Sequence, residues 1–164
     1  MTDFFNKADL SRNDAEKIIS ETLNNCDDGE LYLENSKSES IVLDDGKIKN
    51  STYSSDLGYG LRAVTGEVVA YSHSNEISKN SLKQSADNLS STLKSKKGVY
   101  NHKMPKTNEQ FYKNINPIEE KSLQSKLELL KEVNNYTRAK SGIVHQVTAS
   151  FSGEHKSIEI IRSG

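Results

Sequence analysis

The sequence has few of the residues that build a large hydrophobic core or cross-link a small fold. Only 33% of its 164 residues are hydrophobic, and tryptophan is absent. Cys26 is the only cysteine, which excludes an internal disulfide and a cluster of thiolate metal ligands. The apolar residues nevertheless recur periodically, and this favours a folded domain over a disordered chain. So modest a core indicates that another element normally covers part of the surface.

Long runs of one charge and long apolar runs are also missing. The formal net charge is -1, with acids and bases interspersed, so nothing in the sequence supports nucleic-acid binding. The first residues show neither the basic stretch nor the apolar run of a signal peptide. No segment approaches the roughly 20 apolar residues of a membrane span. We therefore expect a cytoplasmic protein with no membrane partner and no nucleic-acid partner.

Helical periodicity predicts three helices, each with one apolar stripe. The stripes include Ile19 in the first helix, Leu89 in the second, and Leu123, Leu127, Leu130 and Thr137, widened by Leu129 and Val133, in the third. They are expected over residues 14–24, over 78–93, and from Pro117 to just before Ser141. The third helix has the strongest start signal, because Asn116 can cap it and Pro117 suits the first helical position. Residues 94–108 are polar and are expected to form a loop.

Alternating segments predict short antiparallel strands between the first two helices. They are expected over residues 30–38, 39–43, 47–54, 57–64 and 67–74. Asp45-Gly46 and Thr65-Gly66 supply the tight turns of a meander, and every connection is too short for a parallel crossover. A further hairpin is expected to pair residues 143–151 with 156–162 and to turn at Ser152–Glu154.

Together these elements predict an α+β fold, an antiparallel sheet (a meander plus a further hairpin) with about three helices packed mainly on one face. We expect a single domain over residues 1–164, with helix–meander–helix over 1–93, a loop over 94–116 and helix–hairpin over 117–164. The chain stops where a strand gives way to a turn, without a helix stop or a polar tail. It is therefore expected to be the front domain of a larger protein.

No segment carries a complete catalytic or metal-binding pattern, so we predict no catalytic residue and no metal ligand in this chain. The four histidines lack the three- or four-residue spacing that would place two metal ligands on one helix face. His145 and His155 could face each other across the last predicted hairpin, but they are better explained as surface residues. Cys26 follows the end of a helix, where the dipole raises the pKa of a thiol, so it is expected to be unreactive.

The strand that contains Gly58, Gly60 and Arg62 is the segment that suggests a binding surface. The odd-numbered residues from Leu57 to Ala63 share the face expected to pack on the helices, so these three lie on the other face. Two glycines on one strand face bare the backbone and cost stability. Tight packing under a neighbouring side chain would explain them. The functional alternative is that a substrate or another domain lies against this face.

Several stretches resemble the amino-terminal domain of the TldD/PmbA family. They are Ser38-Glu39-Ser40 and residues 42–46, 55–67, 70–72 and 144–154, in the expected order and over nearly the whole chain. The Ser38-Glu39-Ser40 start and the run from Arg62 to Glu67 are more similar to the TldD subunit than to its PmbA (TldE) sister.

The resemblance implies a cytoplasmic metallopeptidase that binds zinc through a His-Glu-x-x-x-His helix in its carboxy-terminal half. The glutamate of such a helix can act as general base on the metal-bound water. This sequence has no His-Glu dipeptide, so no catalytic residue carries over and no cofactor is expected in this chain. The implied partners are its own carboxy-terminal domain, a related TldE/PmbA-type subunit and a peptide substrate.

The resemblance gives this chain a non-catalytic role, in which it helps assembly and encloses the substrate chamber of the peptidase. The alternative is a stand-alone interaction module that binds a partner through its exposed sheet face. A third interpretation, a nucleic-acid or gyrase-associated factor, has no basic surface to support it.

Overall fold

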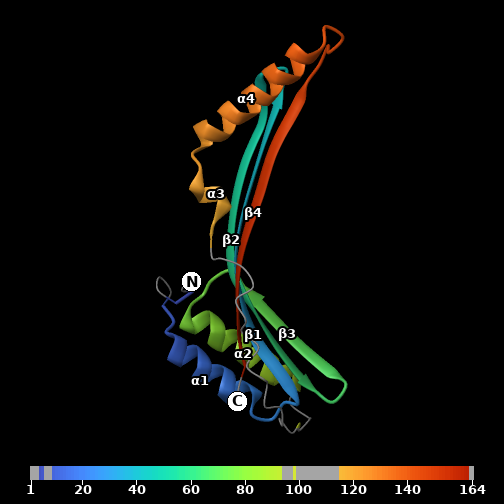
Figure 1. Cartoon of the computed structure of the whole chain (residues 1–164). Coiled ribbons are helices and arrows are strands. Elements are labelled where there is room, and N and C mark those ends of the chain that lie inside the picture. Colours follow the sequence, from blue (N-terminus) through green and yellow to red (C-terminus); the bar gives the residue numbers. More distant parts are fainter. Residues whose placement is uncertain (1–3, 6–8, 94–97, 99–114, 163–164) are drawn as a thin grey trace. The chain divides into compact units, whose positions relative to one another are not determined.

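A computed structural model of the chain describes residues 4–5, 9–93, 98 and 115–162 (Figure 1). Its elements are α1 (Arg12–Leu23), β1 (Asp28–Asp44), β2 (Lys47–Thr65), β3 (Val68–Ser74), α2 (Lys79–Leu93), α3 (Pro117–Glu120), α4 (Leu123–Lys140) and β4 (Thr148–Ile161). The strands form one sheet in the order β3-β2-β1-β4. The predicted α+β class, with helices on an antiparallel sheet, is confirmed.

The meander is confirmed, but it has fewer and longer strands than predicted. Residues 28–44 form the single strand β1 where two were expected, and residues 47–65 form the single strand β2. The expected breaks, between 38 and 39 and near 55, contain no glycine or proline that could end a strand. The two turns lie as predicted, with Gly46 and Gly66 at positive φ.

The predicted last hairpin is wrong, because residues 148–161 form one strand, β4. Gly153, the expected turn residue, does not have the positive φ that tight hairpin turns use. β4 runs antiparallel to β1. Asp45 N–H donates to the Val147 carbonyl at 2.9 Å near one end, and Arg162 pairs with Glu30 near the other. His145 precedes β4 and His155 lies within it, so they do not face each other across a hairpin.

The predicted third helix is interrupted at one point. Asn116 caps α3 as expected, accepting a hydrogen bond from Ile118 N–H at 3.1 Å. Lys121 is extended, and Ser122 then caps α4 by accepting from Ser125 N–H at 3.2 Å. Ser122 therefore acts as a second N-cap, which begins a new helix where periodicity alone predicts continuation. The first two helices lie within two residues of their predicted positions, and the predicted 94–108 loop falls almost entirely outside the described residues.

The chain divides into two compact units. The first unit comprises residues 1–35, 56–113 and 157–164, and the second comprises 36–55 and 114–156. β1, β2 and β4 each contribute residues to both units.

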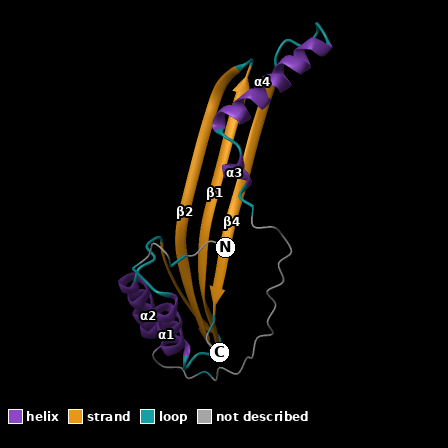
Figure 2. Ribbon diagram, turned by 60° about the vertical axis from the view of Figure 1, so that its left-hand side comes forward, coloured by secondary structure: helices purple, strands orange, loops and turns teal. Residues whose placement is uncertain are grey.

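In the first unit, α1 and α2 lie together on one face of the sheet (Figure 2). The helices supply the predicted apolar stripes, including Ile19 and Leu89, to a core that contains Leu31, Leu33 and Leu61 of the strands. Cys26 is buried beside this core, and burial raises the pKa of its thiol. The expectation of an unreactive thiol is consistent with this burial.

In the second unit, α4 packs on β1 and β4. Its core consists of Ile41, Leu43, Leu130 and Ala149, with Leu127 and Phe151 packed against them. Lys126 is buried in the same layer, with only 4% of the residue exposed. Its ammonium group pairs with Glu39 and donates a hydrogen bond to the Ile118 carbonyl at 2.6 Å. Leu123, Leu129 and Val133 were expected to join the buried stripe of this helix, but they are exposed.

Candidate interaction surfaces

Gly58, Gly60 and Arg62 lie on the face of β2 that points away from α1 and α2, as the alternation predicted. Their neighbours Tyr59, Leu61 and Ala63 are buried in the first unit's core. Leu57 departs from the prediction, because its side chain is 44% exposed. We call the face that carries Gly58, Gly60 and Arg62 the open sheet face of the first unit.

Both glycines meet close neighbours within the chain. A Cβ atom on Gly60 would lie 2.5 Å from the Tyr71 hydroxyl, and one on Gly58 would lie 2.8 Å from the Ser74 carbonyl oxygen. Tyr71 belongs to β3, where it is the register partner of Arg62. Close packing thus accounts for the glycines without a ligand, while Tyr71 itself remains 64% exposed.

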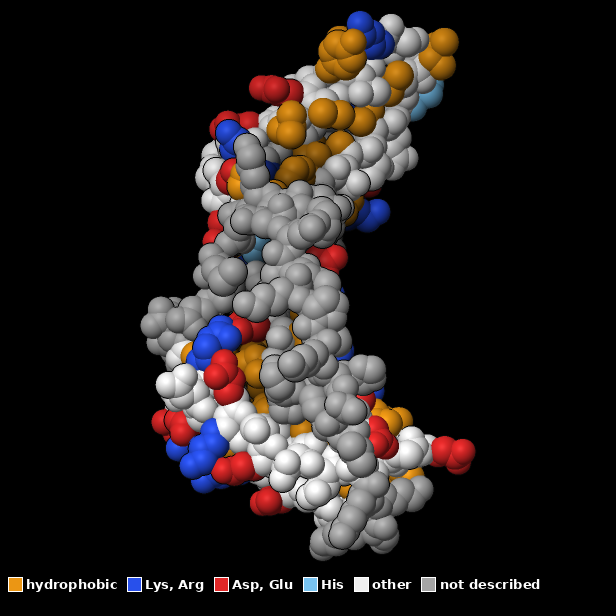
Figure 3. All heavy atoms as spheres, turned by 60° about the horizontal axis from the view of Figure 1, so that its bottom comes forward, with side chains coloured by type: hydrophobic (Ala, Val, Ile, Leu, Met, Phe, Trp, Pro, Cys, Tyr) orange, Lys and Arg blue, Asp and Glu red, His pale blue; other side chains and the backbone are white. Residues whose placement is uncertain are grey.

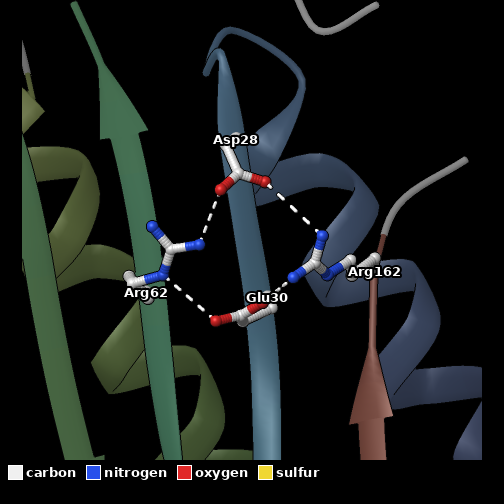
Figure 4. A network of polar contacts seen from close by, with 4 residues as sticks. All are labelled: Asp28, Glu30, Arg62 and Arg162. Carbon is white, nitrogen blue, oxygen red and sulfur yellow. Dashed lines mark hydrogen bonds and ion pairs between the residues drawn. The ribbon is translucent and has the colours of Figure 1, made fainter. Parts of the chain in front are cut away.

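Arg62 belongs to a four-residue charge cluster on the open sheet face (Figure 4). Its guanidinium donates to Asp28 at 2.6 Å and to Glu30 at 3.1 Å. Arg162, just after β4, pairs with Glu30 at 2.5 Å and approaches Asp28 at 4.0 Å. Two acids of β1 therefore bridge a base on β2 to a base at the end of β4.

The cluster neutralises its own charge. The hydrogen bond from Arg62 holds the pKa of Asp28 below its usual range, and the same bond raises the pKa of Arg62. Two carboxylates face two guanidinium groups, so the face presents no net charge here to a partner. The side chains are 20–37% exposed, and the arrangement acts as a clamp across three strands.

Sequence reasoning found Arg62 but missed Asp28, Glu30 and Arg162. A signal was present, because Asp28 and Glu30 alternate with the buried residues of β1 and so share the open sheet face. Pairing them with Arg62 needs the strand register, which a single sequence does not provide. Arg162 was hidden because the last strand was expected to be part of a hairpin.

Apolar residues border the charge cluster on both edge strands. On β3, Val69 is 60% exposed, and the ring of Tyr71 stacks on His73 with centroids 5.8 Å apart. On β4, Ile158 and Ile160 are half exposed and alternate with Ile161, which is in the core. These exposed apolar side chains are the part of the open sheet face that suits contact with another protein or domain.

A second surface lies in the second unit, beside the edge of β4. It is a groove of about 460 Å³ lined on one side by α4, through Leu129, Leu130, Val133 and Thr137, and on the other by residues 146–151. Figure 3 shows hydrophobic side chains gathered at this end of the second unit. None of the lining residues carries a charge.

Neither surface resembles a metal centre. Among the described residues, no group of three or more His, Cys, Asp or Glu side chains is placed to hold a metal ion. Within the same ranges, no helix is both long and apolar enough to cross a membrane.

Comparison with known proteins places the chain in a family. Residues 29–93 match the family model described as PmbA/TldA metallopeptidase domain 1. A Metalloprotease TldD homolog of Buchnera aphidicola is 36% identical over 133 residues, which are 80% of this chain and 28% of that protein. The chain thus spans somewhat under a third of the length of the curated relatives it matches.

Solved structures share the fold. A Bacteroides thetaiotaomicron protein named as a candidate modulator of DNA gyrase aligns with a TM-score of 0.58 at 20% identity, over 90% of this chain and 38% of that one. TldE from Thermococcus kodakarensis aligns with a TM-score of 0.57 at 14% identity, over 90% and 34%.

The fold and the family match define a first domain of the metallopeptidase type. The chain belongs to the PmbA/TldD family, whose domain 1 it contains, and the resemblance seen in its sequence is confirmed.

Proposed function

We propose that this chain is the non-catalytic amino-terminal part of a TldD-like metallopeptidase. In this role it supports assembly and encloses the chamber in which peptides or unfolded segments are cleaved. The observation that carries the proposal is the match of residues 29–93 to metallopeptidase domain 1, in a chain that spans under a third of its TldD-named relatives. The zinc site and the catalytic groups then belong to a carboxy-terminal domain in the remaining two thirds.

The open sheet face is the proposed contact for that carboxy-terminal domain or for the substrate. It carries Gly58, Gly60 and Arg62, and its margins expose Val69, Tyr71, Ile158 and Ile160. The charge cluster fixes β1, β2 and β4 together, so the apolar margins are held on a rigid frame. A related TldE/PmbA-type subunit is the proposed partner of the complete enzyme. The complete enzyme is proposed to be cytoplasmic.

Peptidase activity and metal content test the proposal. The purified 164-residue chain should contain no stoichiometric zinc and should not hydrolyse an unfolded protein substrate. The same chain joined to the carboxy-terminal part of a TldD relative should bind zinc and cleave. Zinc-dependent cleavage by the 164-residue chain alone would show that the proposed division of labour is wrong.

Hydrogen exchange separates this role from that of a stand-alone interaction module. The exposed apolar margins favour some partner on the open sheet face under either role. If the carboxy-terminal domain docks there, amides of β2 residues 57–62 should exchange more slowly in the joined protein than in the 164-residue chain. Equal exchange in both proteins would instead favour the stand-alone module.

A further inference from the structure

α4 is held on its sheet by less apolar contact than either helix of the first unit. Three of its 18 residues are buried, Lys126, Leu130 and Asn134, and only Leu130 is apolar, with Leu127 half-buried beside it. In the first unit, α1 buries four apolar side chains in 12 residues, and α2 buries four apolar side chains and one serine in 15. Apolar burial is the main force that holds a helix on a sheet, so α4 is weakly held.

Asn134 makes the closed position of α4 less favourable still. The residue is only 6% exposed. Its Nδ2 donates to Asn135 Oδ1 at 3.1 Å, but its own Oδ1 is buried and has no hydrogen-bond partner in the part of the chain that the structure describes. A buried acceptor without a donor costs stability, because in water it would be hydrogen-bonded. Asn134 is therefore better solvated when α4 is off the sheet.

Two ion pairs hold α4 down where apolar contacts are few. Lys126 pairs with Glu39 of β1, and Arg138 pairs with Asp45 in the turn between β1 and β2. The first pair is buried, so loss of hydration offsets much of its attraction. The second pair is exposed, so water and salt screen it. Neither pair replaces the missing apolar layer.

Extended residues lie at both ends of α4. Lys121 precedes the Ser122 cap with φ -119° and ψ 138°, and Ser141 follows the helix with φ -160° and ψ 138°. A Cβ atom added to Gly142, the next residue, would lie in open space. Ser122 caps α4 from the adjoining position, so the helix can leave the sheet together with its cap.

We propose that α4 is a lid that opens transiently from the sheet of the second unit. The open state uncovers Ile41 and Leu43 of β1 together with Ala149 and Phe151 of β4, an apolar strip that the closed helix covers. The strands stay paired during the opening, because β1 lies between β2 and β4 in the sheet. The proposal goes beyond the proposed function and does not rest on it, because it concerns a motion within the second unit.

Native-state hydrogen exchange of the 164-residue chain tests the proposal. A detached helix of 18 residues is only marginally stable in water, so the amides of α4 exchange when the lid opens. Amides of residues 127–140 should exchange at least about tenfold faster than those of β1 residues 39–43 and those of α1. One common rate for α4 and residues 39–43 would overturn the proposal, because the whole second unit would then open together. Protection of α4 equal to that of α1 would overturn it as well.

Two asparagine variants test whether the buried amide favours the opening. Asn134→Leu replaces the unpartnered amide with an apolar side chain of similar size, and it should slow the exchange of α4 about tenfold. Asn135→Leu is the matched control, because it makes the same change at the next residue of the helix, which is exposed. Circular dichroism confirms that each variant is folded. No slowing in Asn134→Leu, or equal slowing in both variants, would overturn the proposal.

Discussion

The two units share three strands but differ in what holds them together. Of the described residues, nineteen buried side chains form the core of the first unit and four form that of the second, so apolar burial dominates only in the first. The second unit instead buries a charged pair, Lys126 with Glu39, and exposes the apolar flank of α4. Apolar burial therefore holds the first unit together, whereas the second relies more on polar contacts such as the pair of Lys126 and Glu39.

The difference explains the low apolar content of the sequence. In the second unit a single long helix, α4, lies on three strands and packs on only two of them, β1 and β4. β2 residues 47–55 are all exposed as a result. The low apolar content of the whole sequence is therefore an average over a large apolar core in the first unit and a small one in the second.

Removing the buried cation should give the largest effect and break the second unit. Lys126→Ala leaves Glu39 buried without its partner and frees the Ile118 carbonyl, which we expect to cost about 3–5 kcal/mol. Hydrogen exchange of β1 residues 36–44 should accelerate strongly, while α1 and α2 keep their protection.

A double variant separates charge from packing at this site. Lys126→Met with Glu39→Leu removes both charges and keeps apolar volume, and it should recover most of the lost stability. If Lys126→Ala affects both units equally, the contrast between them would have to be abandoned.

A cavity in the large core should come next and should affect the first unit. Leu61 is fully buried, so Leu61→Ala should lower the free energy of unfolding by about 3 kcal/mol in denaturant titrations. Leu57→Ala on the same strand is the control. Leu57 is 44% exposed, and its loss should cost under about 0.5 kcal/mol.

The sequence predicted the elements better than their ends. Both amino-terminal helices, the two glycine turns, the cap at Asn116 and the helix end before Ser141 follow from local chemistry, which periodicity and residue type report directly. The hairpin at Gly153 failed because glycine also fits an extended strand that packs near Ile118. The lengths of strands depend on pairing partners that local patterns do not contain. The break between α3 and α4 depends on the Ser122 cap, which periodicity alone does not report.

The candidate surfaces show the same limit. The open face of β2 was predicted from alternation alone, because strand geometry fixes which residues share a face. The two acids that pair with Arg62 lie 32–34 residues earlier in the sequence, and Arg162, which pairs with the same acids, lies at its far end. Only strand order brings the four residues together. The groove was missed because Leu129 and Val133 were expected to be part of the buried helix stripe.

The two glycines of β2 should differ in the cost of gaining a methyl group. Gly58→Ala would press on the Ser74 carbonyl, which is backbone and cannot move alone, so we expect a loss of about 1–3 kcal/mol. Gly60→Ala meets only the end of the exposed Tyr71 ring, which can turn aside, and should cost under about 1 kcal/mol. Thermal unfolding of the two variants compares them directly. Equal losses would mean that the contact with Tyr71 is as rigid as the backbone contact.

The charge cluster should give the smallest effect, visible mainly in acid and only in the first unit. The hydrogen bond from Arg62 lowers the pKa of Asp28 in the folded state. In the unfolded state the pKa of Asp28 is about 3.9, so the unfolded chain binds more protons than the folded chain as the pH falls toward that value. The contribution of Asp28 to stability is therefore complete above that value and is lost as the pH falls through the folded pKa.

Asp28→Asn should lower stability at pH 7 by under about 1 kcal/mol and should flatten the loss of stability below pH 5. Arg162→Gln should keep most of the acid dependence, since Arg162 lies 4.0 Å from Asp28 while Arg62 lies at 2.6 Å. Amide signals of β2 residues 59–65 should report the change and those of β1 residues 36–44 should not. An unaltered acid limb in Asp28→Asn would show that the clamp contributes nothing to the stability of the first unit.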